Sequence, residues 1–145
     1  MLRSPEDRSV SVGASGSGPF ANDDAADWVY ELEQADDLTA VRSALEAVIE
    51  VEYLELPEGS EAIAAAEVVA AAGGSGRQEL PPEVTQWLAT TNDRPTLADR
   101  DLALRAVHRA RSADSELAEL WEEADDPSWA QDVDDLIARL EALAE

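Results

Sequence analysis

Acidic side chains at helical spacing are the residues of this sequence best suited to chemistry. Glu52 and Glu55 form one Glu-x-x-Glu pair, and Glu58 and Glu61 form another. On a helix, residues three apart lie on one face, and carboxylate oxygens are the ligands that Mg²⁺ prefers. Helical Mg²⁺-dependent nucleotide pyrophosphatases use such pairs. Glutamate is abundant in this chain, however, so pairs at this spacing also arise by chance.

Two of the glutamates fall in apolar surroundings. Glu52 lies within the apolar stripe of an expected helix, and Glu67 lies inside the alanine-rich run 62–72. A buried carboxylate must be paired, protonated or bound to a metal. We predict that Glu67 is a buried structural acid paired with Arg100 or Arg111, because a helical wheel places these arginines beside an apolar stripe.

A second acidic group opens the first expected helix. Asn22 or Asp23 can cap this helix, and Asp24 and Asp27 suit its positive end. The same side chains could ligate a hard cation, but we favour the explanation that they complement the helix dipole and carry surface charge. The single histidine, His108, excludes a histidine-rich metal site. We therefore assign no catalytic residue, no resident metal and no cofactor from the sequence.

The charge balance is the strongest compositional signal. The chain has 33 acidic and 10 basic residues, a formal net charge of −23, and all of its bases are arginines. An acid excess without lysine suggests a protein of a salt-rich cytoplasm, as in a haloarchaeon. An acidic actinobacterial protein is the alternative. A surface of this charge repels phosphate, so we expect no direct binding to nucleic acid.

No feature of the sequence indicates export or membrane insertion. Residues 1–17 lack the apolar segment of a signal peptide, and the chain of 145 residues contains no cysteine. The longest apolar run, at 62–72, is interrupted by Glu67 and is too short to cross a bilayer. We expect a soluble, cytoplasmic protein that binds no membrane.

Apolar residues recur at the helical period after residue 20, and no strand pattern competes. We predict an all-α fold: a single-domain bundle of six or seven short helices with a glycine-rich N-terminal arm. Residues 1–17 would form a flexible tail and arm, and residues 18–145 a single helical domain. The expected helices cover approximately 23–37, 37–56, 61–72, a short segment opened by Pro81 and Pro82, 97–111, a segment carrying Leu117 to Ala124, and 129–143.

The arm and the first helix carry a family resemblance. The run GSGPFANDDAADW at 16–28 resembles the opening signature of the prokaryotic family called domain of unknown function 4259. The segments at 53–55, 64–71 and 115–123 are similar to later parts of that family, so the resemblance covers most of 13–140. Family members usually begin almost at the glycine arm, often with Trp where Ser15 stands.

The resemblance implies a fold unit but no activity, because the family has none established. It directs attention to polar residues in the matching segments. These are Asn22, Asp23, Asp27, Glu55 and Glu67.

Two hypotheses of function follow. The first is a small acidic interaction or regulatory module of a halophile, without chemistry of its own, that binds a protein partner and is compatible with weak homo-oligomers. The alternative is a Mg²⁺- or Mn²⁺-dependent hydrolase, similar to nucleotide pyrophosphatases, that uses inward carboxylates of Glu52, Glu55 and Glu67. The sequence leaves open whether the protein is an enzyme.

Overall fold

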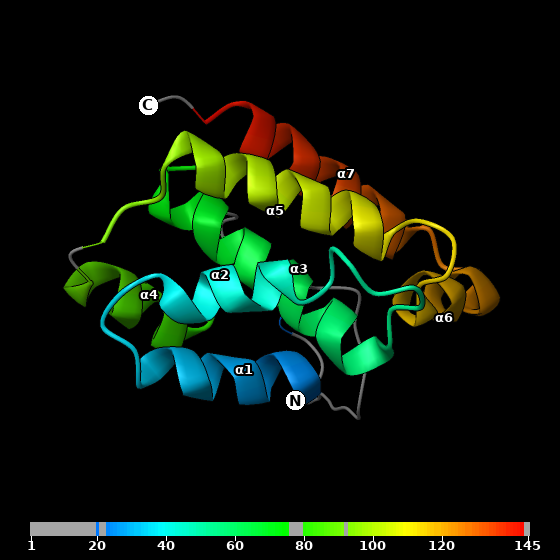
Figure 1. Ribbon diagram of the computed structural model, residues 1–145, viewed down its shortest axis with the longest axis horizontal. Helices are drawn as coiled ribbons and strands as arrows, with labels where there is room; N and C mark the ends of the chain where they lie inside the picture. The colour runs from blue at the N-terminus through cyan, green and yellow to red at the C-terminus, as the bar shows by residue number, and fades with distance from the viewer. Residues whose placement is uncertain (1–19, 21–22, 76–79, 92, 144–145) are drawn as a thin grey trace, which may run out of the picture.

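Helices account for the secondary structure of the described chain. The structure, a computed structural model, describes Phe20 and residues 23–75, 80–91 and 93–143. The predicted tail, the glycine-rich arm and Asn22 lie outside these residues. The all-α class is confirmed (Figure 1). The helices are α1 (Asp23–Glu33), α2 (Thr39–Glu46), α3 (Leu56–Ala72), α4 (Pro82–Thr90), α5 (Leu97–Ala110), α6 (Glu116–Ala124) and α7 (Ser128–Glu141).

Helix α3 is the centre of the fold. It contacts each of the other described helices. Figure 1 shows it crossing the middle of the molecule, with α1 below it and α5 and α7 above it. Residues 62–70 are all buried, and most of them are alanines, which let neighbouring helices approach closely. A helix that is apolar nearly all round belongs in the interior, as the sequence indicated.

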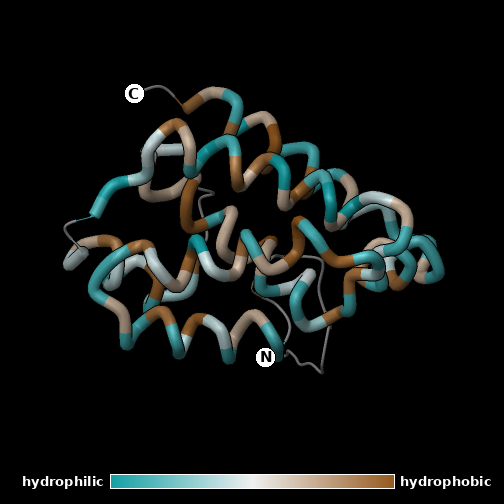
Figure 2. The backbone as a smooth tube through the Cα atoms, viewed as in Figure 1, coloured by the Kyte–Doolittle hydropathy of each residue, from teal (hydrophilic) through white to brown (hydrophobic). Residues whose placement is uncertain are grey.

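The outer helices bury one face only. Along α1 and α7, apolar residues turn toward the core and polar residues toward solvent (Figure 2). The buried residues of α1 are Ala25, Trp28, Val29 and Leu32, and those of α7 are Val133, Leu136 and Leu140. These positions are the apolar stripes that the helical period predicted.

The segment between α2 and α3 departs from the expected boundaries. The predicted helix from residue 37 to 56 is too long, because α2 ends at Glu46. Helix α3 begins at Leu56 instead of Glu61, so Pro57 lies in its first turn. Proline is favoured there because the first helical N–H groups have no partner within the helix. The intervening residues 47–55 form a loop that reaches α6.

Charged side chains join helices that are distant in sequence. Thr96 and Asp99 form a capping box at the start of α5. Asp99 also accepts two hydrogen bonds from Arg42 of α2, at 2.8 and 2.9 Å. These bonds from Arg42, with those from Thr96, hold the pKa of the Asp99 carboxyl below its usual value despite burial.

Candidate functional site

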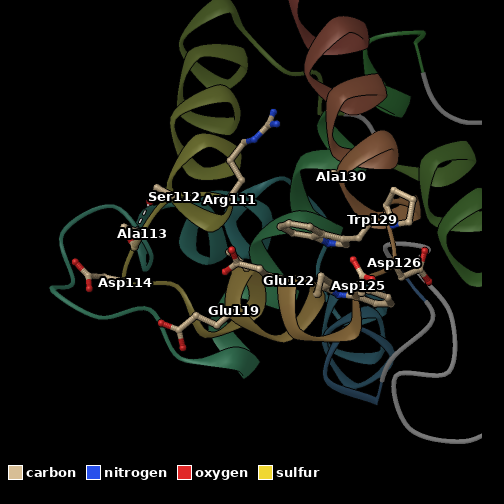
Figure 3. A pocket seen from close by; sticks show the side chains of 13 residues that line it. Arg111, Ser112, Ala113, Asp114, Glu119, Glu122, Asp125, Asp126, Trp129 and Ala130 are labelled. Carbon is tan, nitrogen blue, oxygen red and sulfur yellow. Dashed lines mark hydrogen bonds between the residues drawn. The ribbon is translucent and has the colours of Figure 1, made fainter.

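An open cleft of about 820 Å³ lies beside α6. We call it the α6 cleft. Its walls are the residues after α5, one face of α6, and the turn that leads into α7 (Figure 3). The lining residues are Arg111, Ser112, Ala113, Asp114, Ala118, Glu119, Trp121, Glu122, Asp125, Asp126, Pro127, Trp129 and Ala130.

Two aspartates set the backbone at the two ends of α6. Asp114 has φ 63° and Asp125 has φ 55°, and they are the non-glycine residues with positive φ in the described chain. Aspartate tolerates this left-handed conformation better than most residues, because its short side chain can bond locally. Asp125 is the C-cap of α6, and its N–H donates to the carbonyl of Glu122. Both turns direct the chain around the α6 cleft.

The wall at the end of α5 is fixed by Arg109. Its Nη2 donates to the carbonyl oxygens of Val51 at 3.1 Å, Glu52 at 3.3 Å and Asp114 at 3.2 Å. Its Nη1 donates to the carbonyl of Ala113 at 3.3 Å. Nη1 also donates to the Ser112 hydroxyl at 3.3 Å, so one guanidinium ties the loop before α3 to the loop before α6.

A short backbone pairing continues the same connection. The N–H of Leu54 donates to the carbonyl of Asp114, and the N–H of Glu116 donates to the carbonyl of Leu54, both at 2.8 Å. The Glu116 carboxylate accepts from the N–H of Leu56 at 2.8 Å and so satisfies a free donor at the start of α3. The segments around residues 54 and 115, which both carry the family resemblance, thus meet in space.

Carboxylates dominate the α6 cleft. Five acidic side chains and one basic side chain line it. The base, Arg111, has its Nη1 2.8 Å from Oδ1 of Asp134, outside the cleft lining. Glu119 accepts a hydrogen bond from the Tyr53 hydroxyl at 2.9 Å, and this bond raises the pKa of Tyr53 to about 12. The cleft therefore carries a local negative excess.

Three of these carboxylates have no partner among the residues that the structure describes: those of Asp114, Glu122 and Asp125. The indole N–H groups of Trp121 and Trp129 likewise donate to no described residue. Both tryptophans pack partly against the core and partly face the cleft. The cleft thus brings together aromatic faces with acceptors and donors that no described residue satisfies.

The structure does not gather the predicted site residues. Asp23 and Asp27 are exposed on α1, and Asn22 lies outside the described residues. Glu52 and Glu55 are exposed in the loop before α3, so the predicted inward position of Glu52 is wrong. The apolar neighbours of Glu52 belong to a loop instead of a helix, so helical spacing could not predict the direction of its side chain.

Glu67 is buried, but its predicted partners are wrong. Its side chain is 1% exposed, and its two oxygens each accept a 2.8 Å bond from Arg139 of α7. Arg100 pairs with Asp101 and donates to the carbonyl of Leu143. The bonds that Arg139 donates to the buried Glu67, followed by the one it donates to Asp135, raise the pKa of Arg139 above its usual value.

Arg111 is likewise not a partner of Glu67, because it pairs with Asp134. The sequence signal for Arg139 was its position three residues after Leu136, which places it beside the apolar stripe of the last helix. The α6 cleft itself had a weaker signal, the two tryptophans on either side of the Asp125-Asp126-Pro127 break.

No cation site emerges from the acidic residues in the described ranges. There, no group of three or more His, Cys, Asp or Glu side chains is arranged to hold a metal ion. No helix of these ranges is both long and apolar enough to cross a membrane.

The fold and the α6 cleft define an acidic all-α domain with one-sided aromatic and carboxylate character. The chain belongs to the family described as Domain of unknown function (DUF4259), whose model matches residues 13–132. That match contains every helix up to α6, the α6 cleft and the first turn of α7. No curated protein and no solved structure matches the chain.

Proposed function

We propose that this protein is a non-enzymatic interaction module and that the α6 cleft is its docking surface. The observation that carries the proposal is the cleft itself, where two tryptophans and carboxylates without a partner among the described residues line one open hollow. Interfaces are enriched in aromatic residues of this kind. The wall tied by Arg109 gives the surface a fixed shape, so less conformational entropy is lost on binding.

The hydrolase alternative lacks a comparable observation. It requires Glu52, Glu55 and Glu67 to share a cation. Glu55 precedes α3 and Glu67 lies twelve residues later, a separation of about 18 Å along a helix axis. A cation binds carboxylate oxygens at about 2.0–2.6 Å, so these residues cannot share one. The carboxylate of Glu67 is moreover already paired with Arg139.

We also propose that the module works in a salt-rich cytoplasm. A net charge of −23 on 145 residues repels itself over a Debye length of about 30 Å in dilute buffer and of about 3 Å at molar salt. High salt would therefore favour the compact state and leave short-range contacts in the α6 cleft to determine the choice of partner.

Site-specific photo-crosslinking tests the docking surface. A photoreactive residue at Ala130, which is exposed and lines the α6 cleft, is compared with the same residue at Ala89, which is exposed on α4. Expressed in native cells, the Ala130 protein should form one discrete adduct that the Ala89 protein does not form.

An adduct of twice the mass of the chain would identify a second copy as the partner. Equal labelling from both positions, or no adduct from Ala130, would refute the α6 cleft as a docking surface.

A further inference from the structure

The lining of the α6 cleft favours a positively charged occupant. Glu122 of α6 and Asp125, the C-cap of α6, both line the cleft, and neither carboxylate has a partner in the described chain. The one base of the lining, Arg111, is held by Asp134 at 2.8 Å. An anionic occupant would meet five carboxylates, whereas a cationic occupant would satisfy acceptors that the described fold leaves free.

The two tryptophans favour a flat cation over a compact one. Trp121 of α6 and Asp125, the C-cap of that helix, both line the cleft. Trp129 comes from the first turn of α7, beyond the break at Asp126 (Figure 3). A cation over an indole face is attracted by the ring, and the attraction is stronger once water is displaced. Carboxylates beside indole faces therefore suit a flat cation that can stack and bond at once.

We infer that the α6 cleft binds an arginine-bearing basic segment of a partner protein, with a guanidinium stacked on indole and bonded to Glu122 or Asp125. This inference rests on the proposed function and names its partner class. An arginine side chain can grip a carboxylate with two parallel bonds and stack on an aromatic face, whereas the lysine ammonium is compact and strongly hydrated. The open cleft leaves room for the chain that carries the side chain.

Synthetic peptides of defined charge provide the test. Fluorescent peptides of glycine and serine carry three arginines, three lysines or three citrullines, and citrulline keeps the shape of arginine without its charge. Fluorescence anisotropy with the full chain, at 0.15 M and 1 M KCl, gives each dissociation constant. We expect arginine to bind most tightly and citrulline least tightly at both salt concentrations, because stacking survives screening.

Two neighbouring glutamates of α6 provide a matched pair of variants. Glu122 lines the α6 cleft, Glu123 does not, and both are exposed. Glu122→Gln should weaken the arginine peptide about tenfold, the effect of losing one charge-assisted bond. Glu123→Gln removes the same charge and should change binding by less than about twofold. General attraction to an acidic surface would affect both variants equally.

A third variant isolates the stacking contribution. Trp129→Leu should reduce the preference for arginine over lysine, with circular dichroism confirming that α7 remains folded. Equal effects of the two glutamate variants, equal binding of the arginine and lysine peptides, or no peptide binding would each overturn the inference. A partner crosslinked at Ala130 without a basic segment would also overturn it, but would leave the proposed function standing.

Discussion

Glutamine at position 67 would show what a single buried ion pair contributes to this alanine-rich fold. The Glu67 side chain is 1% exposed, and Arg139, 15% exposed, reaches it from α7 with two bonds of 2.8 Å. Glu67→Gln keeps the shape but turns one acceptor oxygen into an NH₂ donor that faces a guanidinium N–H. Losing one charge-assisted bond and opposing two donors should cost about 3 kcal/mol.

That cost corresponds to a Tm lowered by about 9 °C, because a domain of this size loses about 3 °C per kcal/mol. Arg139→Met should cost more, about 3–5 kcal/mol, because it leaves a buried carboxylate without its partner. Replacing both Glu67 and Arg139 with methionine should recover most of the loss, because no unpaired charge then remains.

A second ion pair that also involves α7 serves as the control. Arg111 of the α5 C-cap and Asp134 of α7 also approach to 2.8 Å, but their side chains are 34% and 65% exposed. Asp134→Asn should therefore cost less than about 1 kcal/mol. Urea unfolding in 1 M KCl, followed by helical circular dichroism, measures all of these variants. Equal losses for Glu67→Gln and Asp134→Asn would refute the reasoning that burial decides the contribution.

Three further predictions concern charge elsewhere in the fold. Bonds from Arg42 lower the pKa of Asp99 from 3.8, so the ionised Asp99 carboxylate should stabilise the fold fully above about pH 4, and this stabilisation should be lost on further acidification. Asp99→Asn should therefore make the urea midpoint depend less steeply on pH below about pH 4. Burial raises the pKa of Glu61 from 4.5, and repulsion from the nearby charges of Glu31 and Glu58 adds to this effect. The charged form of Glu61 therefore destabilises the fold. Glu61→Gln should raise the urea midpoint at pH 7, and the gain should vanish below about pH 4.5, whereas a loss at pH 7 would contradict it. Transfer from 1 M to 0.01 M KCl should lower the Tm and the helical circular dichroism, and an unchanged spectrum and Tm would rule out dependence on salt screening.

Structural features that depend on residues close together in the chain could be predicted from the sequence. The all-α class, the buried run around Glu67 and the capping box of Thr96 and Asp99 each depend on residues within one or two turns of one another, so the sequence carries them directly. The partner of Glu67 depends on where α7 packs against α3. Glu67 and Arg139 are 72 positions apart, so their spacing in the sequence cannot indicate that they pair. The extent of α2 was overestimated because apolar loop residues such as Val48 continue its pattern while packing into the core.

The placement of arginines explains why an acidic cleft survives in the folded chain. Arg42 and Arg139 lie between helices and bond to carboxylates that are almost fully buried. Arg109 lies near the α6 cleft, but it donates to carbonyls such as those of Val51 and Ala113 and to the Ser112 hydroxyl. In an acid-rich chain, arginines committed in this way cannot also neutralise Glu122. The carboxylates of the cleft that lack a described partner thus follow from the way the fold is held together, and the proposed basic partner would supply the charge that the described fold does not.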